Sequence, residues 1–336
     1  MNHAADTVDQ VRSKQHSRLV FIDRACGLAI CLVVYAHILF PETLKIDWYL
    51  RSEEFIYKFH MPLFICLSGY LAFMSATNAR INSQQAYWRF QRKKLLKFLP
   101  VYFLFSLYAI LVDIFLQQVT AQDISDYIFS FFFTPTKSSA VFLWYLYILI
   151  GFYLVTPFLI KLEGSTQVLL LVIAFLLTNV SLTPLFCFDF FCKFFFFFLG
   201  GGLIYKHSDR FFLFLEKNGK WIAMLALVLT IVDFFNYFPI PFQVISLLMI
   251  PSFLYVSKLN WSESFSKVIV AIGVSSFAIY LLNTSLINLY FILFRSFLKL
   301  EINALFIFSC FLLTVGVAVW IRTVFNRFIP RRVYVL

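Results

Sequence analysis

Residues 21–38 read FIDRACGLAICLVVYAHI, and this stretch sets the class of fold. No charged residue lies between Arg24 and His37, and the apolar run continues past the histidine. A helix that crosses a bilayer needs about 20 consecutive and mainly apolar residues. We therefore predict a membrane-spanning helix near residues 25–42, with one histidine inside it.

The composition extends this prediction to the whole chain. Of the 336 residues, 61% are hydrophobic and 13% are charged, and the mean hydropathy is +0.84. Soluble domains carry about 25% charged residues, so a soluble enzyme and a disordered chain are both excluded. We predict an all-α integral membrane protein with about ten transmembrane helices. The apolar runs lie near residues 25–42, 58–78, 98–117, 140–160, 166–185, 190–205, 221–238, 242–257, 267–289 and 302–321.

The basic residues predict the orientation. With both termini cytoplasmic, 21 of the 28 lysines and arginines fall in inside segments, as the retention of positive charge at the cytoplasmic face requires. The net charge of +11 thus reflects topology, with lipid head groups rather than nucleic acid as its partner. We expect a cytoplasmic segment over 1–24, one membrane domain over 25–321 and a basic cytoplasmic tail over 322–336.

His37 is the leading candidate for chemistry, because polar groups inside a span are costly and are often functional. At 100° per residue, Cys26 and His37 lie about 20° apart on one helix face, whereas Arg24 points away. Asp23 lies near the same face at the cytoplasmic end. A packing role for His37, hydrogen-bonded to a neighbouring helix, remains the alternative. Asp113 and Asp233 are further acids inside expected spans.

Two more stretches carry polar groups at span ends. FHMPLFICLSGYLAF, residues 59–73, places His60 at an outer end and Ser68 and Gly69 deeper, where small residues allow close helix contact. WRFQRKKLLKFLPVYF, residues 88–103, leads a basic cluster into the third span. Lys94 and Lys97 are spaced to share a face and could bind phosphates, or the cluster could serve only as a cytoplasmic anchor.

These stretches resemble the membrane-bound acyltransferase-3 family. The first resembles its opening signature of Asp, a basic residue, Gly-Leu-Ala, an apolar run and His, and the second is similar to its second-span motif. Supporting similarities lie in the lead into Pro100, in the segment around Trp144, in FFFFFLGGGLIY over 194–205 and in VSSFAIYLLNTSLI over 274–287. The resemblance covers about residues 20–290. It departs at Cys26, where the family has a basic residue, and at Asn283, where many relatives have His.

The resemblance implies transfer of an acyl group, usually acetyl, from cytoplasmic acyl-CoA to a sugar hydroxyl of a polysaccharide, O-antigen, capsule or lipid-linked precursor. It also implies that His37 is essential and that Lys94 and Lys97 correspond to the basic pair before the third-span proline. Our hypothesis for the mechanism takes His37 as general base on the sugar hydroxyl and no metal, with Asp23 as a partner at the cytoplasmic end that is too far along the helix to touch His37. We expect Lys94 and Lys97, with Arg92 and Lys93 nearby, to bind the CoA phosphates, and His60, Ser68, Trp144, Tyr280 and Asn283 to contact substrate. We expect the enzyme in a plasma (bacterial inner) membrane.

Two other functions remain open from the sequence. A transporter or flippase for a glycolipid or small solute would also need many spans and intramembrane acids, but it gives no reason for the ordered motifs. A scaffold in polysaccharide assembly, working with partner chains, is suggested by Cys26 and Asn283. The six cysteines show no metal spacing, and Cys187 and Cys192 form the one candidate disulfide pair.

Overall fold

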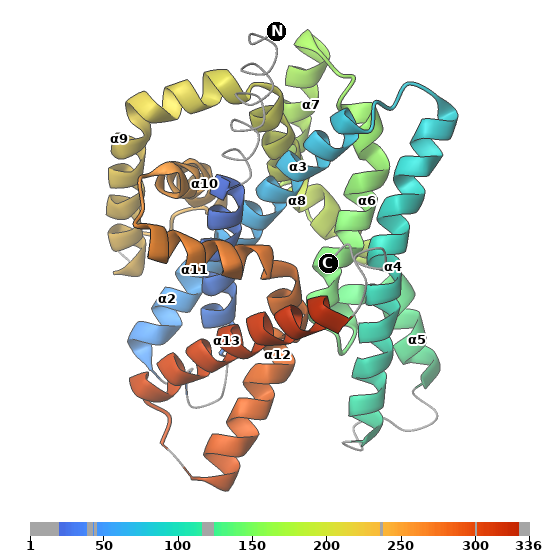
Figure 1. The fold of residues 1–336 in the computed structure, drawn as a ribbon. Helices are drawn as coiled ribbons and strands as arrows, with labels where there is room; N and C mark the ends of the chain where they lie inside the picture. Colours follow the sequence, from blue (N-terminus) through green and yellow to red (C-terminus); the bar gives the residue numbers. More distant parts are fainter. Residues whose placement is uncertain are drawn as a thin grey trace, which may run out of the picture. The chain divides into compact units, whose positions relative to one another are not determined.

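The computed structural model describes residues 20–38, 43, 46–115, 124–235, 238–299 and 301–328, and its regular elements in these ranges are helices (Figure 1). Six helical stretches there are long and apolar enough to cross a membrane: Asp47–Asn78, Gln84–Phe115, Val141–Leu159, Leu185–Lys206, Ser276–Arg295 and Ala304–Arg327. Two further apolar helices, Gly164–Leu177 and Phe242–Lys258, are shorter. The all-α class is therefore confirmed with six candidate spans in the described residues, and the count of ten spans stays a prediction.

The chain divides into two compact units, residues 1–64 with 210–336 and residues 65–209. The first unit contains a helical segment over 20–36, α2 (Asp47–Tyr57), the first turn of α3 (His60–Asn78) and α9 (Ser208–Phe234) from residue 210 onward. It continues with α10 (Phe242–Lys258), α11 (Glu263–Val274), α12 (Ser276–Phe291), the π-helical η5 (Ile292–Phe297) and α13 (Ala304–Phe328). Helices α12 and α13 pack against each other (Figure 1). Their apolar side chains bury one face of segment 20–36.

The expected span over 267–289 is wrong as a single helix, because the chain breaks at Ser275 between α11 and α12. Ser275 has φ −90° and ψ 1°, outside the regular helical values. Its hydroxyl donates to the carbonyl of Ala271 at 2.7 Å, a back-bond to the preceding turn that often bends helices. The break starts a new helix direction just before the segment that carries Asn283 (Figure 1).

Two glycines bring segment 20–36 and α11 into backbone contact. A Cβ added to Gly273 would lie 1.7 Å from the carbonyl oxygen of Asp23, and one added to Gly27 would lie 2.3 Å from that of Ile269. Real Cβ atoms do not approach a carbonyl so closely, so these positions accept only glycine at this helix spacing. The glycine of the first motif thus fixes where its helix crosses α11.

The second unit contains the rest of α3, α4 (Gln84–Phe115), α5 (Ile124–Phe133), α6 (Trp144–Leu159), α7 (Gly164–Leu177) and α8 (Phe188–Lys206). Short 3₁₀ turns lie at Pro135–Lys137, Val141–Leu143 and Leu185–Cys187. Helix α4 begins fourteen residues before the expected apolar run at 98, because its first half is polar and basic and gives no apolar signal. Its second half contains the apolar residues of the expected third span.

Phenylalanines of α8 build the core of this unit. Phe198 stacks on Phe152 of α6 with ring centroids 4.4 Å apart, and Phe194, Phe197 and Phe198 are buried. A glycine contact sits beside them, since a Cβ on Gly201 would lie 1.8 Å from the Cys66 carbonyl oxygen. A Cβ on Gly69 would lie 2.0 Å from the Phe198 carbonyl oxygen. The close helix contact expected at Gly69 is therefore confirmed, with α8 as the partner of α3.

Candidate active site

His37 directly follows the helical segment 20–36 and is hydrogen-bonded to α12 of the same unit. Its Nδ1 lies 2.9 Å from Oδ1 of Asn283, a residue with no exposed surface. The Asn283 Nδ2 donates to the carbonyl oxygen of Tyr280 one turn earlier. Two residues that sequence motifs single out, 246 positions apart, therefore meet in one polar contact.

A second histidine and a tyrosine lie beside His37. The His60 and Tyr57 rings have centroids 6.4 Å and 6.2 Å from that of His37, and 4.9 Å from each other. His60 is buried, and its Nδ1 donates to the Ile56 carbonyl at 2.9 Å. Because that hydrogen bond uses Nδ1, Nε2 is the remaining polar atom of the His60 ring. His37, His60, Tyr57 and Asn283 form what we call the histidine cluster.

Tyr57 is the member of this cluster that the sequence did not reveal. It closes α2, a helix that falls between the first two expected spans, where a connecting segment was expected. Apolar residues recur on one face of α2, with Tyr49, Phe55 and Ile56 buried, so an amphipathic pattern was present. Its polar and charged residues interrupt the apolar sequence, so hydropathy alone does not predict this helix.

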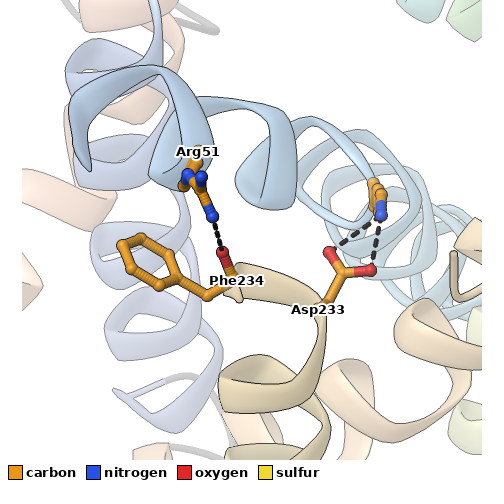
Figure 2. A network of polar contacts seen from close by, with 4 residues as sticks. Arg51, Asp233 and Phe234 are labelled. Atoms are coloured by element: carbon orange, nitrogen blue, oxygen red, sulfur yellow. Dashed lines mark hydrogen bonds and ion pairs between the residues drawn. The ribbon is translucent and has the colours of Figure 1, made fainter. Parts of the chain in front are cut away.

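An ion pair holds the turn between α2 and α3, which carries Tyr57 and His60. The Nζ of Lys58 lies 2.6 Å and 2.8 Å from the two carboxylate oxygens of Asp233 at the end of α9 (Figure 2). Arg51 donates to the Phe234 carbonyl at 3.2 Å in the same network (Figure 2). Ser246 also donates to the Lys58 carbonyl. Asp233 therefore binds a lysine of the turn, and the geometry gives it a structural role.

The Asp233→Ala variant is expected to be about 2 kcal/mol less stable than wild type, because Lys58 loses its partner in a largely buried pair. Thermal unfolding in detergent measures this change. Glu263→Ala is the matched control, since its pair with Lys267 is exposed and worth less than about 0.5 kcal/mol. A variant at Asp233 with normal stability and no activity would contradict the structural role.

Asp23 and Arg24 lie at the opposite end of segment 20–36. The Asp23 carboxylate interacts electrostatically with Arg322 of α13. Asp23 and His37 are fourteen positions apart, about 21 Å along a helix, so the Asp23 carboxylate does not reach the His37 ring. The predicted catalytic partnership of the two residues therefore has no contact to support it.

Arg24 makes structural contacts with the helices that follow α9. Its guanidinium donates to the Ser266 hydroxyl at 2.8 Å and 3.0 Å and to the carbonyls of Ser257 and Leu259 at 3.1 Å. It also lies 5.0 Å from the Trp261 ring centroid. Helix arithmetic placed Arg24 away from the face of Cys26 and His37, and its guanidinium indeed contacts residues 257–266 rather than the histidine cluster.

The basic cluster of α4 belongs to the second unit. The Lys94 Nζ lies 4.4 Å from the Tyr153 ring centroid, and the Lys97 Nζ lies 5.3 Å from that of Phe98. Both lysines are half-buried, whereas Arg92 and Lys93 are exposed. Aromatic faces thus hold the two lysines whose i, i+3 spacing first singled them out.

Ser68 and Trp144 also belong to the second unit, and both have protein partners. The hydroxyls of Ser68 and Tyr145 lie 2.8 Å apart, and the Trp144 ring stacks on Phe194 with centroids 5.3 Å apart. Asp113 of α4 is buried, and its Oδ2 has no hydrogen-bond partner in the described part of the chain. The substrate contacts predicted for Ser68 and Trp144 stay predictions.

All six cysteines are free, so the predicted Cys187–Cys192 disulfide is wrong. Both thiols are buried, on either side of the start of α8. In the described ranges, no three side chains of histidine, cysteine, aspartate or glutamate gather as a metal site would require.

The described residues thus form a helical chain with candidate membrane spans and a hydrogen-bonded histidine cluster. A family model described as an acyltransferase domain, that of the acyltransferase-3 family, matches residues 19–323, and the chain therefore belongs to this family. The match includes both units and confirms the resemblance seen in the motifs. No curated protein and no solved structure matches the chain.

Proposed function

We propose that this protein transfers an acyl group, most simply acetyl, from cytoplasmic acyl-CoA to a sugar hydroxyl. The acceptor is a surface polysaccharide, O-antigen, capsule or lipid-linked glycan precursor. One observation carries the proposal: the acyltransferase family match spans a helix whose buried end holds His37 in a hydrogen bond to Asn283. The enzyme works in the plasma membrane with both termini in the cytoplasm, an orientation supported by the basic residues.

His37 acts as the general base in this proposal. It removes the proton from the sugar hydroxyl while the oxygen attacks the thioester carbonyl carbon. The carbon–sulfur bond then breaks, the acyl group stays on the sugar as an ester, and the proton passes to the CoA sulfur. Neutral imidazole suits this task because it accepts and returns a proton near neutral pH.

Lys94 and Lys97 bind the phosphates of acyl-CoA in the same proposal, with Arg92 and Lys93 nearby. Their half-burial against aromatic rings limits their motion, which favours a defined anion site over a loose cytoplasmic anchor. Lysine binds phosphate as a point charge and lacks the two-pronged geometry of arginine.

Loss of Lys94 or Lys97 should therefore weaken the binding of the nucleotide phosphates of acyl-CoA. Lys94→Ala and Lys97→Ala are each expected to raise KM for acetyl-CoA by about 10-fold, the value of one charge-assisted phosphate contact. Values of kcat/KM for S-acetyl-pantetheine, which lacks the nucleotide phosphates, should remain within about twofold. Lys161→Ala, at an exposed lysine of the same unit, is the control. An equal fall in kcat/KM for both donors would instead indicate that the two lysines serve only to pack against the rings of Tyr153 and Phe98.

The proposed reaction itself is tested on cells that carry or lack the gene. Surface glycans from cells with the wild-type protein should contain base-labile acyl esters that disappear in the deletion strain, with export unchanged. Glycan that remains inside the deletion strain, with its esters intact, would instead indicate a transporter or flippase.

A further inference from the structure

The Asn283 carboxamide has partners on both sides, and they determine its orientation. Its Nδ2 faces the backbone carbonyl of Tyr280, and its Oδ1 lies 3.3 Å from the Thr284 hydroxyl and 2.9 Å from His37 Nδ1. A carbonyl oxygen only accepts hydrogen bonds, so the group facing Tyr280 must be the NH₂. The reverse orientation would place two oxygens together and leave a fully buried amide without its hydrogen bonds.

This orientation also fixes the proton on His37. Oδ1 of Asn283 can only accept, so the His37 Nδ1 that it contacts must carry a hydrogen. In a neutral imidazole one nitrogen is then protonated, and the other, Nε2, has the free electron pair. The carboxamide thus selects one of the two neutral tautomers.

We propose that Asn283 is a positioning residue that holds His37 in the Nδ1–H tautomer and leaves Nε2 as the atom that takes the proton of the sugar hydroxyl. This inference rests on the proposed acyl transfer and names the atom within it. It also replaces the sequence prediction that Asn283 contacts the substrate. Asn283 is fully buried and has His37, Tyr280 and Thr284 as its polar partners in the described ranges.

The side chain of Asn283 is a neutral carboxamide, and this affects how strongly His37 holds a proton. A carboxylate in this position would stabilise the protonated imidazole, whereas Asn283 orients the ring without holding the proton there. Nε2 can then return the proton to the departing CoA sulfur in the same turnover. The other titratable groups that face His37 are the rings of Tyr57 and His60. Glu53 lies one turn before Tyr57, and Lys58 is paired with Asp233.

The tautomer is tested without activity by ¹⁵N NMR of the histidine-labelled protein in detergent, with His37→Gln used to assign the signal. We expect Nδ1 of His37 to show the shift of a protonated nitrogen and Nε2 that of an unprotonated one. The opposite pattern would overturn the inference. The expected tautomer in a protein that transfers no acyl group would support the positioning of the His37 ring by Asn283 and refute the proposed function.

The role in catalysis is tested by Asn283→Leu and Asn283→Asp in the acetyl transfer assay. Leucine removes the acceptor, so kcat should fall about tenfold or more while KM for both substrates stays within threefold. Aspartate keeps the acceptor and adds charge, so the acid limb of the pH profile should move up by about one pH unit or more. Asn218→Leu, at a partly exposed asparagine that also donates to a backbone carbonyl, is the control.

Two results would overturn the positioning role. The first is a rise in KM for the sugar with unchanged kcat in Asn283→Leu, which would make Asn283 a substrate-binding residue. The second is an unmoved pH profile in an active Asn283→Asp variant, which would show that the side chain does not act through His37. If Asn283→Leu does not fold, the pH profile of Asn283→Asp and the ¹⁵N NMR signals of His37 in the wild-type protein still test the positioning role.

Discussion

His37→Ala is expected to lower the rate of acyl transfer by about 10²- to 10⁴-fold, the contribution of a positioned general base. The variant loses the atom that accepts the hydroxyl proton, while the binding of donor and acceptor depends on other residues. The loss should therefore appear in kcat, with KM for acetyl-CoA nearly unchanged. Initial rates of label transfer from acetyl-CoA, measured in membranes at equal protein content, give both constants.

The matched control is His207→Ala, because His207 is an exposed histidine just after α8 and makes no side-chain contact in the proposed site. It should retain the wild-type rate. Wild-type transfer by His37→Ala would contradict the general-base role. A variant that is inactive because it is unfolded is recognised by its thermal unfolding in detergent.

Gly201→Ala is expected to lose most of its folded protein. The new methyl group would lie 1.8 Å from the Cys66 carbonyl oxygen, so α8 would have to move away from α3 along a contact that also includes Gly69. Overpacking of a core commonly costs about 1–3 kcal/mol, and a clash with backbone cannot be relieved by a rotamer change. We expect a cost of about 3 kcal/mol, measured as a fall in thermal unfolding temperature and in the yield of monodisperse protein.

The neighbouring Gly200 gives a strict control for this variant. A Cβ on Gly200 would meet no atom within 4 Å, so Gly200→Ala should be neutral or slightly stabilising. Normal unfolding temperatures for both variants would show that α3 and α8 do not approach as closely as described. The other unit offers the same kind of pair. A Cβ added to Gly273 would lie 1.7 Å from the Asp23 carbonyl oxygen, so Gly273→Ala should destabilise the protein. A Cβ added to Gly316 would meet no atom within 4 Å, so Gly316→Ala is its control.

Apolar runs predicted those helices whose ends coincide with a change in polarity. Helices α3, α6, α8, α10 and α13 begin within a few residues of the expected positions, because lipid-facing helices need apolar residues on all sides. Helix α2 and the first half of α4 were missed because they carry charge. The break at Ser275 was missed as well, since a single serine hydroxyl bonded to the preceding turn leaves the hydropathy of the run unchanged.

The candidate site was only partly predictable for a related reason. Helix geometry correctly separated Arg24 from the face of His37, because regular helix runs from residue 20 to residue 36, directly before His37. His37, His60 and Asn283 were each singled out by motif, yet no periodicity within a single helix relates His37 to a residue 246 positions away. Their meeting depends on how α12 packs against segment 20–36, which glycines 27 and 273 help to set through α11.

The central claim is tested most directly with purified protein in lipid vesicles that contain a lipid-linked glycan and acetyl-CoA labelled in the acetyl group. The account predicts label in a base-labile ester on the glycan, release of free CoA thiol in equal amount, and neither product with His37→Ala. Movement of the glycan across the bilayer without ester formation, or equal ester formation by His37→Ala, would contradict it.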